Sequence, residues 1–277
     1  MCSLPRSSIP FHIQQSAQPA YIEHILSIVS NDQVFDAESL RSGQGTHQIP
    51  SSGISRSLQL GKKLGLFEKP DRSIYKLTAR GRACRKLALF RREVYCDVMH
   101  FLLFATWELG GRRHYWSWSY AKTCEIFWHD KPSIRNRKAI FGQLSAEAAE
   151  EFPDLDPVVG TETVYAVTNW LRELSPPFFV LENNKLLASE EREWFSVELA
   201  LLAVSYLHAT RGAVVQTPLL LDGDTVELLS PLCLASVDRV VAMIETASRT
   251  FPFLDIHTGE WGSSVVLRQA VDIPMLI

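Results

Sequence analysis

The chain has 277 residues, of which 46% are hydrophobic, and a formal net charge of −3. This length and composition allow a sizeable core and predict two or three domains. No run of 18 apolar residues occurs and the first twenty residues lack the apolar segment of a secretion signal, so we expect neither a membrane span nor secretion. The five cysteines are scattered and form no C-x-x-C pair, a usage typical of a reducing, cytoplasmic compartment.

The charge is strongly segregated along the sequence. Residues 41–92 hold 13 Lys and Arg but only two acidic residues, Glu68 and Asp71, a surplus of 11 positive charges. The last 139 residues have the opposite balance, with 7 basic and 20 acidic side chains. This pattern predicts one small module built to bind a polyanion and an acidic remainder with another purpose.

Two short helices are predicted at the start of the basic module. The first begins near Pro19 and carries apolar residues at helical spacing as far as Val29. The second covers about Asp36 to Arg41, with Asp36 as its N-cap. A polar stretch that contains two glycines then interrupts the helical pattern.

The third predicted helix has one apolar and one polar face. It runs from a cap at Ser51 or Ser52 to about Leu64. Its apolar face is formed, at steps of four, three and three residues, by Ile54, Leu58, Gly61 and Leu64. Its opposite face carries hydrogen-bond donors for phosphates and bases: Ser52, Ser55, Arg56, Gln59, Lys62 and Lys63. Such a helix meets the requirements for reading the major groove of DNA.

A hairpin is predicted directly after this helix. Gly65 is available as a left-handed C-cap. Residues 66–68 and 73–78 have the pattern of two strands, joined by a turn over residues 69–72. Thr78 is then expected to cap a further helix.

The run SRSLQLGKKLGLFEKPDRSIYKLTARGRACRKL, residues 55–87, resembles the winged helix-turn-helix superfamily found in many bacterial regulators. In that superfamily a recognition helix ends in L-G-L, a short wing follows, and a Y-x-L-T-x-x-G-R signature starts the next helix. The resemblance covers about residues 20–90 and implies a DNA-binding fold. The loop between the second and third predicted helices is longer than is usual there.

With this fold, we expect the basic residues to bind double-stranded DNA. Arg56, Gln59 and Lys63 would face the major groove, while Lys69 and Arg72 at the wing tip would approach the backbone or minor groove. The full set of expected DNA-binding residues is Ser52, Ser55, Arg56, Gln59, Lys62, Lys63, Lys69, Arg72, Lys76, Arg80 and Arg82. Six to eight phosphate contacts predict a strongly salt-dependent affinity. The alternatives are a protein-docking module or a merely solvated basic face.

In the middle of the chain, the apolar pattern of residues 91–109 predicts a buried helix. An aromatic-rich segment with interspersed cations follows it. The aromatics are interpreted as packed core in preference to a stacking platform for unpaired bases. Helices over about 134–151 and 160–174, and a hairpin turning at Asn183 and Asn184, hint at a second winged-helix-like unit. Because this unit is acidic, it is expected to contact protein rather than DNA.

The sequence of the C-terminal third predicts a mixture of helices and strands. Residues 190–211 have the pattern of a long apolar helix, and a hairpin is expected to turn at Asp222-Gly223-Asp224. A helix over about 235–248 and a final pair of strands follow. This third is expected to serve as a structural or partner-binding unit.

The sequence contains no strong catalytic motif. Neither Gly61-Lys62-Lys63 nor Gly43-Gln44-Gly45 completes a phosphate-binding or dinucleotide-binding pattern. Four side chains able to bind zinc have spacings that match no familiar site and are better read as core: Cys96, His100, Cys124 and His129. The carboxylates and lysine of a metal-dependent nuclease are present, but not at strand-pair spacing: Asp154, Asp156, Glu182 and Lys185. We therefore expect no catalytic residues, no metal and no cofactor.

The predicted fold is α+β and predominantly helical. Its expected domains are a winged helix-turn-helix over 15–90, a helical domain over 91–189 and a partner-binding or dimerising domain over 190–277. The expected function is non-catalytic recognition of double-stranded DNA as a subunit of a larger nucleoprotein complex. The layout resembles winged-helix proteins encoded beside phosphorothioate-modification and phage-defence genes, which favours this function. A stand-alone dimeric transcriptional regulator and a nuclease component are the alternatives.

Overall fold

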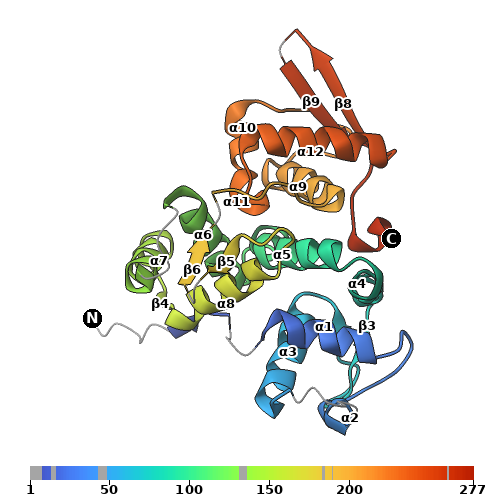
Figure 1. Ribbon diagram of the computed structural model, residues 1–277, viewed down its shortest axis with the longest axis vertical. Coiled ribbons are helices and arrows are strands. Elements are labelled where there is room, and N and C mark those ends of the chain that lie inside the picture. The colour runs from blue at the N-terminus through green and yellow to red at the C-terminus, as the bar shows by residue number, and fades with distance from the viewer. Residues whose placement is uncertain are drawn as a thin grey trace.

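The computed structural model describes residues 8–13, 17–42, 49–130, 136–182, 185–188, 190–260 and 262–277. Helices dominate it and the sheets are small, which confirms the predominantly helical α+β class (Figure 1). Within these ranges no helix has both the length and the apolar character that a membrane crossing requires. Cys2, the Gly43–Gly45 stretch and the expected turn at Asn183 and Asn184 lie outside the described residues.

The N-terminal unit has the predicted order of elements. It comprises α1 (Pro19–Ile28), α2 (Ala37–Ser42), α3 (Ser51–Lys63), β2 (Phe67–Glu68), β3 (Lys76–Leu77) and α4 (Ala79–Phe90). Asp36 caps α2 as expected, because its carboxylate accepts hydrogen bonds from the backbone N–H groups of Glu38 and Ser39 at 3.0 and 2.7 Å. Thr78 likewise caps α4 by accepting from the N–H of Gly81 at 2.9 Å. The expected serine cap of α3 is wrong, since Pro50 occupies the cap position and offers no side-chain acceptor.

The hairpin β2–β3 is extended by a third segment of chain. The backbone N–H of Phe35 donates to the carbonyl of Tyr75 at 2.9 Å, and the N–H of Tyr75 donates back at 2.7 Å. The linker between α1 and α2 is therefore tied to the second strand of the hairpin. Gly65 has a φ of 71°, so the predicted left-handed C-cap of α3 is confirmed.

The apolar face of α3 is buried as its periodicity predicts. Ile54, Leu58 and Leu64 have at most 1% of their surface exposed. Gly61 allows the hairpin to approach the helix closely, since a Cβ at this position would lie 2.3 Å from the ring of Phe67. Phe67 is itself buried, so the distance between α3 and the hairpin is set by a contact that leaves no room for a side chain.

A central helical layer follows. It contains α5 (Arg92–Leu109), α6 (Tyr115–Asp130), α7 (Arg137–Glu151), α8 (Thr161–Arg172), the hairpin β5 (Phe179–Glu182) and β6 (Lys185–Ala188), and the parallel pair β1 (Ser8–Pro10) and β4 (Asp156–Val158). Helix α5 packs against α4, α6 and α9 and so forms the centre of the molecule. Trp118 and Tyr120 are almost fully buried, which confirms the core interpretation and rules them out as a stacking platform.

The C-terminal unit corrects two predictions. It contains α9 (Val197–Thr210), β7 (Leu219–Leu220), α10 (Gly223–Glu227), α11 (Ser230–Cys233), α12 (Val237–Thr250), β8 (Leu254–Gly259), β9 (Gly262–Leu267) and the short 3-10 helix η2 (Ile273–Leu276). The helix expected from residue 190 begins only at Val197, capped by Ser196. The hairpin expected at Asp222 is also wrong. Asp222 instead caps α10 by accepting from the N–H of Thr225 at 2.8 Å, and β7 pairs with β9.

A buried ion pair joins the central layer to the C-terminal unit. Asp97 on α5 lies 2.8 Å from the guanidinium of Arg192, and both side chains are completely buried. Asp97 also accepts from the N–H of Ser196 at 2.7 Å, while Arg192 donates to the carbonyls of Ser175 and Pro176. Residues 190–196 are not part of α9, and within them Arg192 and Ser196 both bond to Asp97.

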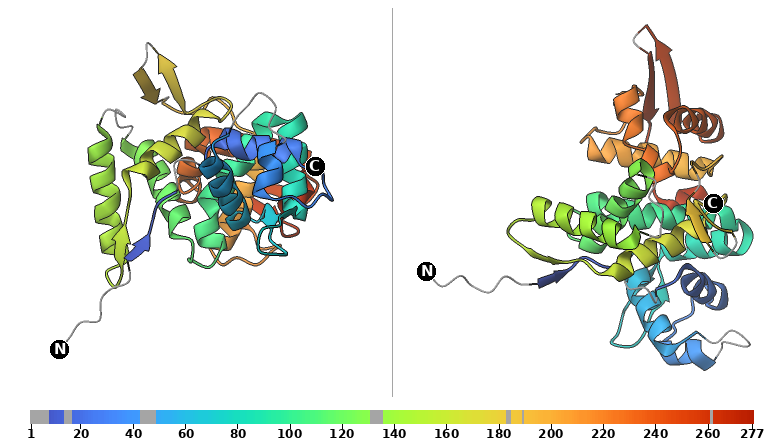
Figure 2. Two further views of the ribbon diagram at one scale, coloured as in Figure 1. Left: turned by 90° about the horizontal axis from the view of Figure 1, so that it is seen from below. Right: turned by 60° about the vertical axis from the view of Figure 1, so that its left-hand side comes forward.

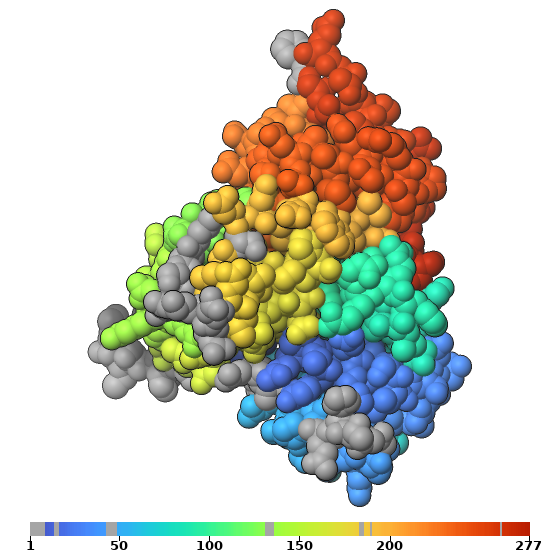
Figure 3. Space-filling model, viewed as in Figure 1, coloured from blue at the N-terminus to red at the C-terminus, as the bar shows by residue number. Residues whose placement is uncertain are grey.

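The molecule is elongated, with the basic N-terminal unit and the acidic C-terminal unit at opposite ends (Figure 1). The N-terminal unit lies at the bottom of Figure 1 and the β8–β9 hairpin at the top, an order that the second view in Figure 2 repeats. The space-filling view shows the same separation of the two ends (Figure 3). The last residues run back from the C-terminal unit toward the N-terminal one, and η2 packs against α4.

Candidate nucleic-acid interface

The polar face of α3 is open to solvent. Ser52, Arg56, Gln59 and Lys62 are exposed and Ser55 is half-buried, whereas the opposite face forms core. Their spacing of three and four residues places them in one row along the helix. The helix thus presents hydroxyl, amide and cationic donors over its exposed length, the groups that contact base edges and phosphates in protein–DNA complexes.

The hairpin tip and α3 form the two sides of one groove of about 290 Å³. Ser55 and Gln59 line it from the helix, and Lys69 and Arg72 line it from the tip. Arg41, in the last turn of α2, lines the same groove. Arg41 lies within the basic segment but was missing from the expected contacts, because the register of α2 relative to α3 does not follow from the sequence.

Carboxylates offset part of the positive charge in this groove. Asp36 and Glu38 at the start of α2 also line it. Asp36 is committed to capping α2, and the bonds it accepts from Ser39 lower the pKa of its carboxyl group. Lys69 lies 5.4 Å from the centre of the Tyr75 ring, a cation–π distance that leaves its charge available at the tip. The groove therefore carries three cations against two carboxylates.

Lys63 and Lys76 are less available than the sequence suggests. The amino group of Lys63 lies 6.0 Å from the centre of the Trp116 ring, and burial lowers its pKa. Lys76 forms an ion pair of 3.0 Å with Glu68 on the neighbouring strand. Both side chains retain solvent contact, but each already has a partner within the protein.

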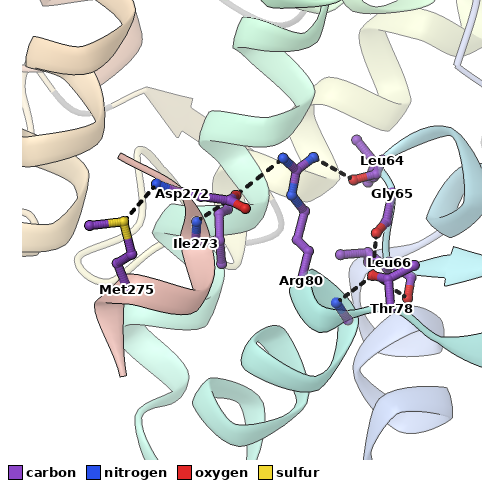
Figure 4. A network of polar contacts seen from close by, with 9 residues as sticks. Leu64, Gly65, Leu66, Thr78, Arg80, Asp272, Ile273 and Met275 are labelled. Carbon is purple, nitrogen blue, oxygen red and sulfur yellow. Dashed lines mark hydrogen bonds and ion pairs between the residues drawn. The ribbon is translucent and has the colours of Figure 1, made fainter. Parts of the chain in front are cut away.

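Two of the expected DNA-binding arginines have structural roles. Arg80 donates to the carbonyl of Leu64 and to the carboxylate of Asp272, each at 3.3 Å, and so connects the end of α3 to the C-terminal tail (Figure 4). Arg82 donates to the carbonyl of Leu77 at 3.1 Å. The basic surface is consequently concentrated on α3 and the hairpin tip, and α4 contributes less to it than its composition suggests.

Two of the residues considered for zinc binding, Cys96 and His100, are buried on α5 and poorly suited to hold a metal. Both ring nitrogens of His100 are hydrogen-bonded, to the Tyr120 hydroxyl at 2.8 Å and to the Leu232 carbonyl at 2.7 Å. Burial raises the pKa of the Cys96 thiol to about 12, which disfavours the thiolate form that binds metals. Across the described ranges, no three His, Cys, Asp or Glu side chains gather as a metal-binding group.

The residues considered for a nuclease are distributed over two sheets. Asp156 lies in β4, which pairs with β1, whereas Glu182 and Lys185 are paired at the end of the β5–β6 hairpin. Asp154 precedes β4 in a turn. The strands therefore do not bring these four residues together on one sheet.

No family model, curated protein or solved structure matches the chain.

Proposed function

We propose that the protein binds double-stranded DNA, without catalysing a reaction, through α3 and the β2–β3 hairpin. The observation that carries the proposal is the groove that the exposed row of α3 shares with the hairpin tip. Helix α3 would enter the major groove with Arg56 and Gln59 toward the bases, and the tip would place Lys69 and Arg72 near the adjacent backbone. The order α1, α2, α3, β2, β3 supports a winged helix-turn-helix unit for residues 20–90.

The charge separation supports a role within a larger assembly. The basic unit and the acidic C-terminal unit lie at opposite ends of the molecule (Figure 1). A DNA-bound N-terminal unit would leave the acidic end directed away from the polyanion, where it remains accessible to protein partners. We therefore favour a DNA-recognition subunit of a nucleoprotein complex. A stand-alone regulator would instead use the acidic end for dimerisation.

The DNA-binding proposal is tested by a salt-titrated affinity measurement on the full chain. The variant combines Arg56→Ala, Gln59→Ala and Arg72→Ala, all at exposed positions. Gln59 and Arg72 line the groove, and Arg56 lies on the same exposed face of α3. Removing one phosphate-binding cation reduces the slope of log affinity against log salt by about 0.9, so the loss of Arg72 should flatten it by that amount. The loss of Arg56 and Gln59, which face the bases, should lower the affinity further. The control is Arg249→Ala, which removes an exposed cation from α12 at the other end.

Unchanged DNA affinity and salt slope in the triple variant would refute the proposed contact surface. Sedimentation of the purified protein then separates the two roles. A subunit is expected to be monomeric and to bind DNA alone with a Kd of roughly 10⁻⁴ to 10⁻⁶ M, the range of non-specific binding at physiological salt. A dimer that binds a palindromic site tightly would favour the regulator.

A further inference from the structure

A second recess lies at the junction of the N-terminal unit, the central layer and the C-terminal tail. Its volume is about 290 Å³, at the small end of ligand sites, which span about 300 to 1,000 Å³. It is lined from α3, α4, α5 and α9 and by the residues just before η2. None of its lining residues lines the groove between α3 and the hairpin tip, so it is a separate feature.

The interior of this recess is apolar. Phe101, Leu102 and Ala105 of α5, Leu202 of α9 and Ile273 of the tail contribute to its lining, and each is at most 5% exposed. The hydroxyl of Thr106 is also present but donates to the carbonyl of Leu102 within α5. A ligand that fills this space must therefore present an apolar body to it.

The rim of the recess is cationic. Three cations, Lys62, Lys63 and Arg80, line it beside His114, against a single carboxylate, that of Asp272. Asp272 is already paired with Arg80 at 3.3 Å (Figure 4). In the part of the chain that the structure describes, no carboxylate lies within ion-pair distance of Lys62 or Lys63. The carbonyl end of α3 offers them only about half a negative charge, so the rim keeps a positive surplus.

The titration of two rim groups agrees with this surplus. Burial lowers the pKa of Lys63. The pKa of His114 is lowered first by burial and then by the positive charges of Lys63 and Arg113. The lowered pKa values of Lys63 and His114 mean that their protonated forms lack a neutralising partner. A bound anion would supply this partner.

We propose that this recess binds a small amphiphilic carboxylate. Its head group lies between Lys62 and Lys63, and its apolar body packs on Phe101, Leu102 and Leu202. The site is built from residues of all three parts of the chain, so occupation stabilises their arrangement. Because Lys62 and Lys63 also belong to the basic face of α3, the bound carboxylate weakens DNA binding; this last step depends on the function proposed above.

The binding experiment compares octanoate with its uncharged analogue octanamide. Thermal unfolding and calorimetric titration of the full chain are expected to show stabilisation by octanoate and at least tenfold weaker binding of octanamide. The variant Lys62→Gln/Lys63→Gln removes the rim charges at exposed positions and should weaken octanoate binding about tenfold or more. Ser205→Phe, at a half-buried lining position on α9, should block the recess sterically. Lys69→Gln at the hairpin tip is the control and should bind octanoate as the wild type does.

Three results would overturn the proposal: no stabilisation by octanoate, equal binding of octanamide, or wild-type octanoate binding in both recess variants. The DNA and octanoate measurements fail independently, because Arg56, Gln59 and Arg72 do not line this recess. Octanoate binding without DNA binding would leave the recess assigned and refute the DNA function. DNA binding without octanoate binding would support the DNA function and refute the assignment of the recess.

Discussion

Moderate acid is expected to destabilise the protein through His100. This side chain is completely buried and hydrogen-bonded at both ring nitrogens. The Leu232 carbonyl can only accept, so Nε2 carries the proton and Nδ1 accepts from the Tyr120 hydroxyl. Burial is the main reason why the pKa of His100 falls from 6.5 to about 4; the Leu232 bond and Asp97 oppose the shift, and Arg192 adds to it. The folded state therefore holds His100 neutral well below the pH at which the unfolded chain protonates it.

The size of the effect follows from the difference between the two pKa values. Above pH 6.5 both states are neutral and His100 contributes no pH dependence. Below that value the unfolded chain binds a proton that the folded protein does not. The free energy of unfolding then falls by about 1.4 kcal/mol per pH unit. Between pH 6.5 and 5 this amounts to about 2 kcal/mol, and to about 3 kcal/mol by pH 4.

Other groups with lowered pKa values change the stability of the protein in identifiable pH ranges. Burial lowers the pKa of His114 and of His208, so both add to the loss of stability below pH 6.5. Hydrogen bonds lower the pKa of the Asp222 carboxyl group, and the Arg268 pair lowers that of Asp255. These carboxylates start from a pKa of 3.8, so their stabilising contributions are lost mainly below pH 4.

The assay is urea unfolding followed by tryptophan fluorescence at intervals between about pH 7.5 and 5. His100→Gln retains an amide donor for the Leu232 carbonyl but cannot titrate, so its unfolding free energy should depend less on pH than that of the wild type. His257→Gln changes an exposed histidine on β8 and is the control. An identical pH dependence in the wild type and His100→Gln would refute the reasoning.

Four further substitutions should change stability, measured by the same urea unfolding at pH 7. Arg192→Met leaves the Asp97 carboxylate buried without its cation and should cost about 3–5 kcal/mol, whereas no loss would contradict the role of the pair. Gly61→Ala places a methyl group against the buried Phe67 ring and should cost about 1–3 kcal/mol; Gly142→Ala, in an open position on α7, should instead stabilise by about 0.5–1 kcal/mol. Ile273→Ala should cost about 2–5 kcal/mol if the tail is integral to the core, while Ile277→Ala at the half-exposed end should change little.

The regular elements with strong local signals were predicted well. The apolar spacing of α3, the caps Asp36 and Thr78 and the left-handed Gly65 all follow from residues within a few positions of one another. Predictions failed where one local signal fits two structures. Asp222-Gly223-Asp224 is typical of a hairpin turn, but an aspartate followed by small and polar residues is also a helix start, and here Asp222 caps α10.

The candidate site was predicted in outline but not in its composition. The exposed row of α3 and the hairpin tip follow from periodicity and turn residues. Arg80 and Arg82 could not be distinguished from surface cations, because their partners are backbone carbonyls and a carboxylate 192 residues away. Arg41 was missed for the converse reason, since only the packing of α2 brings it to the groove.

The sequence by itself determined the segregation of charge and the two-faced character of α3, because both depend only on the order of residues along the chain. Tertiary structure decided which cations face solvent and which bond internally. It also decided that the basic and acidic units lie at opposite ends of the molecule (Figure 1). The recess between α3, α5, α9 and the tail exists only in the folded chain. Its walls come from segments more than 200 residues apart, and no local pattern records which of them will meet.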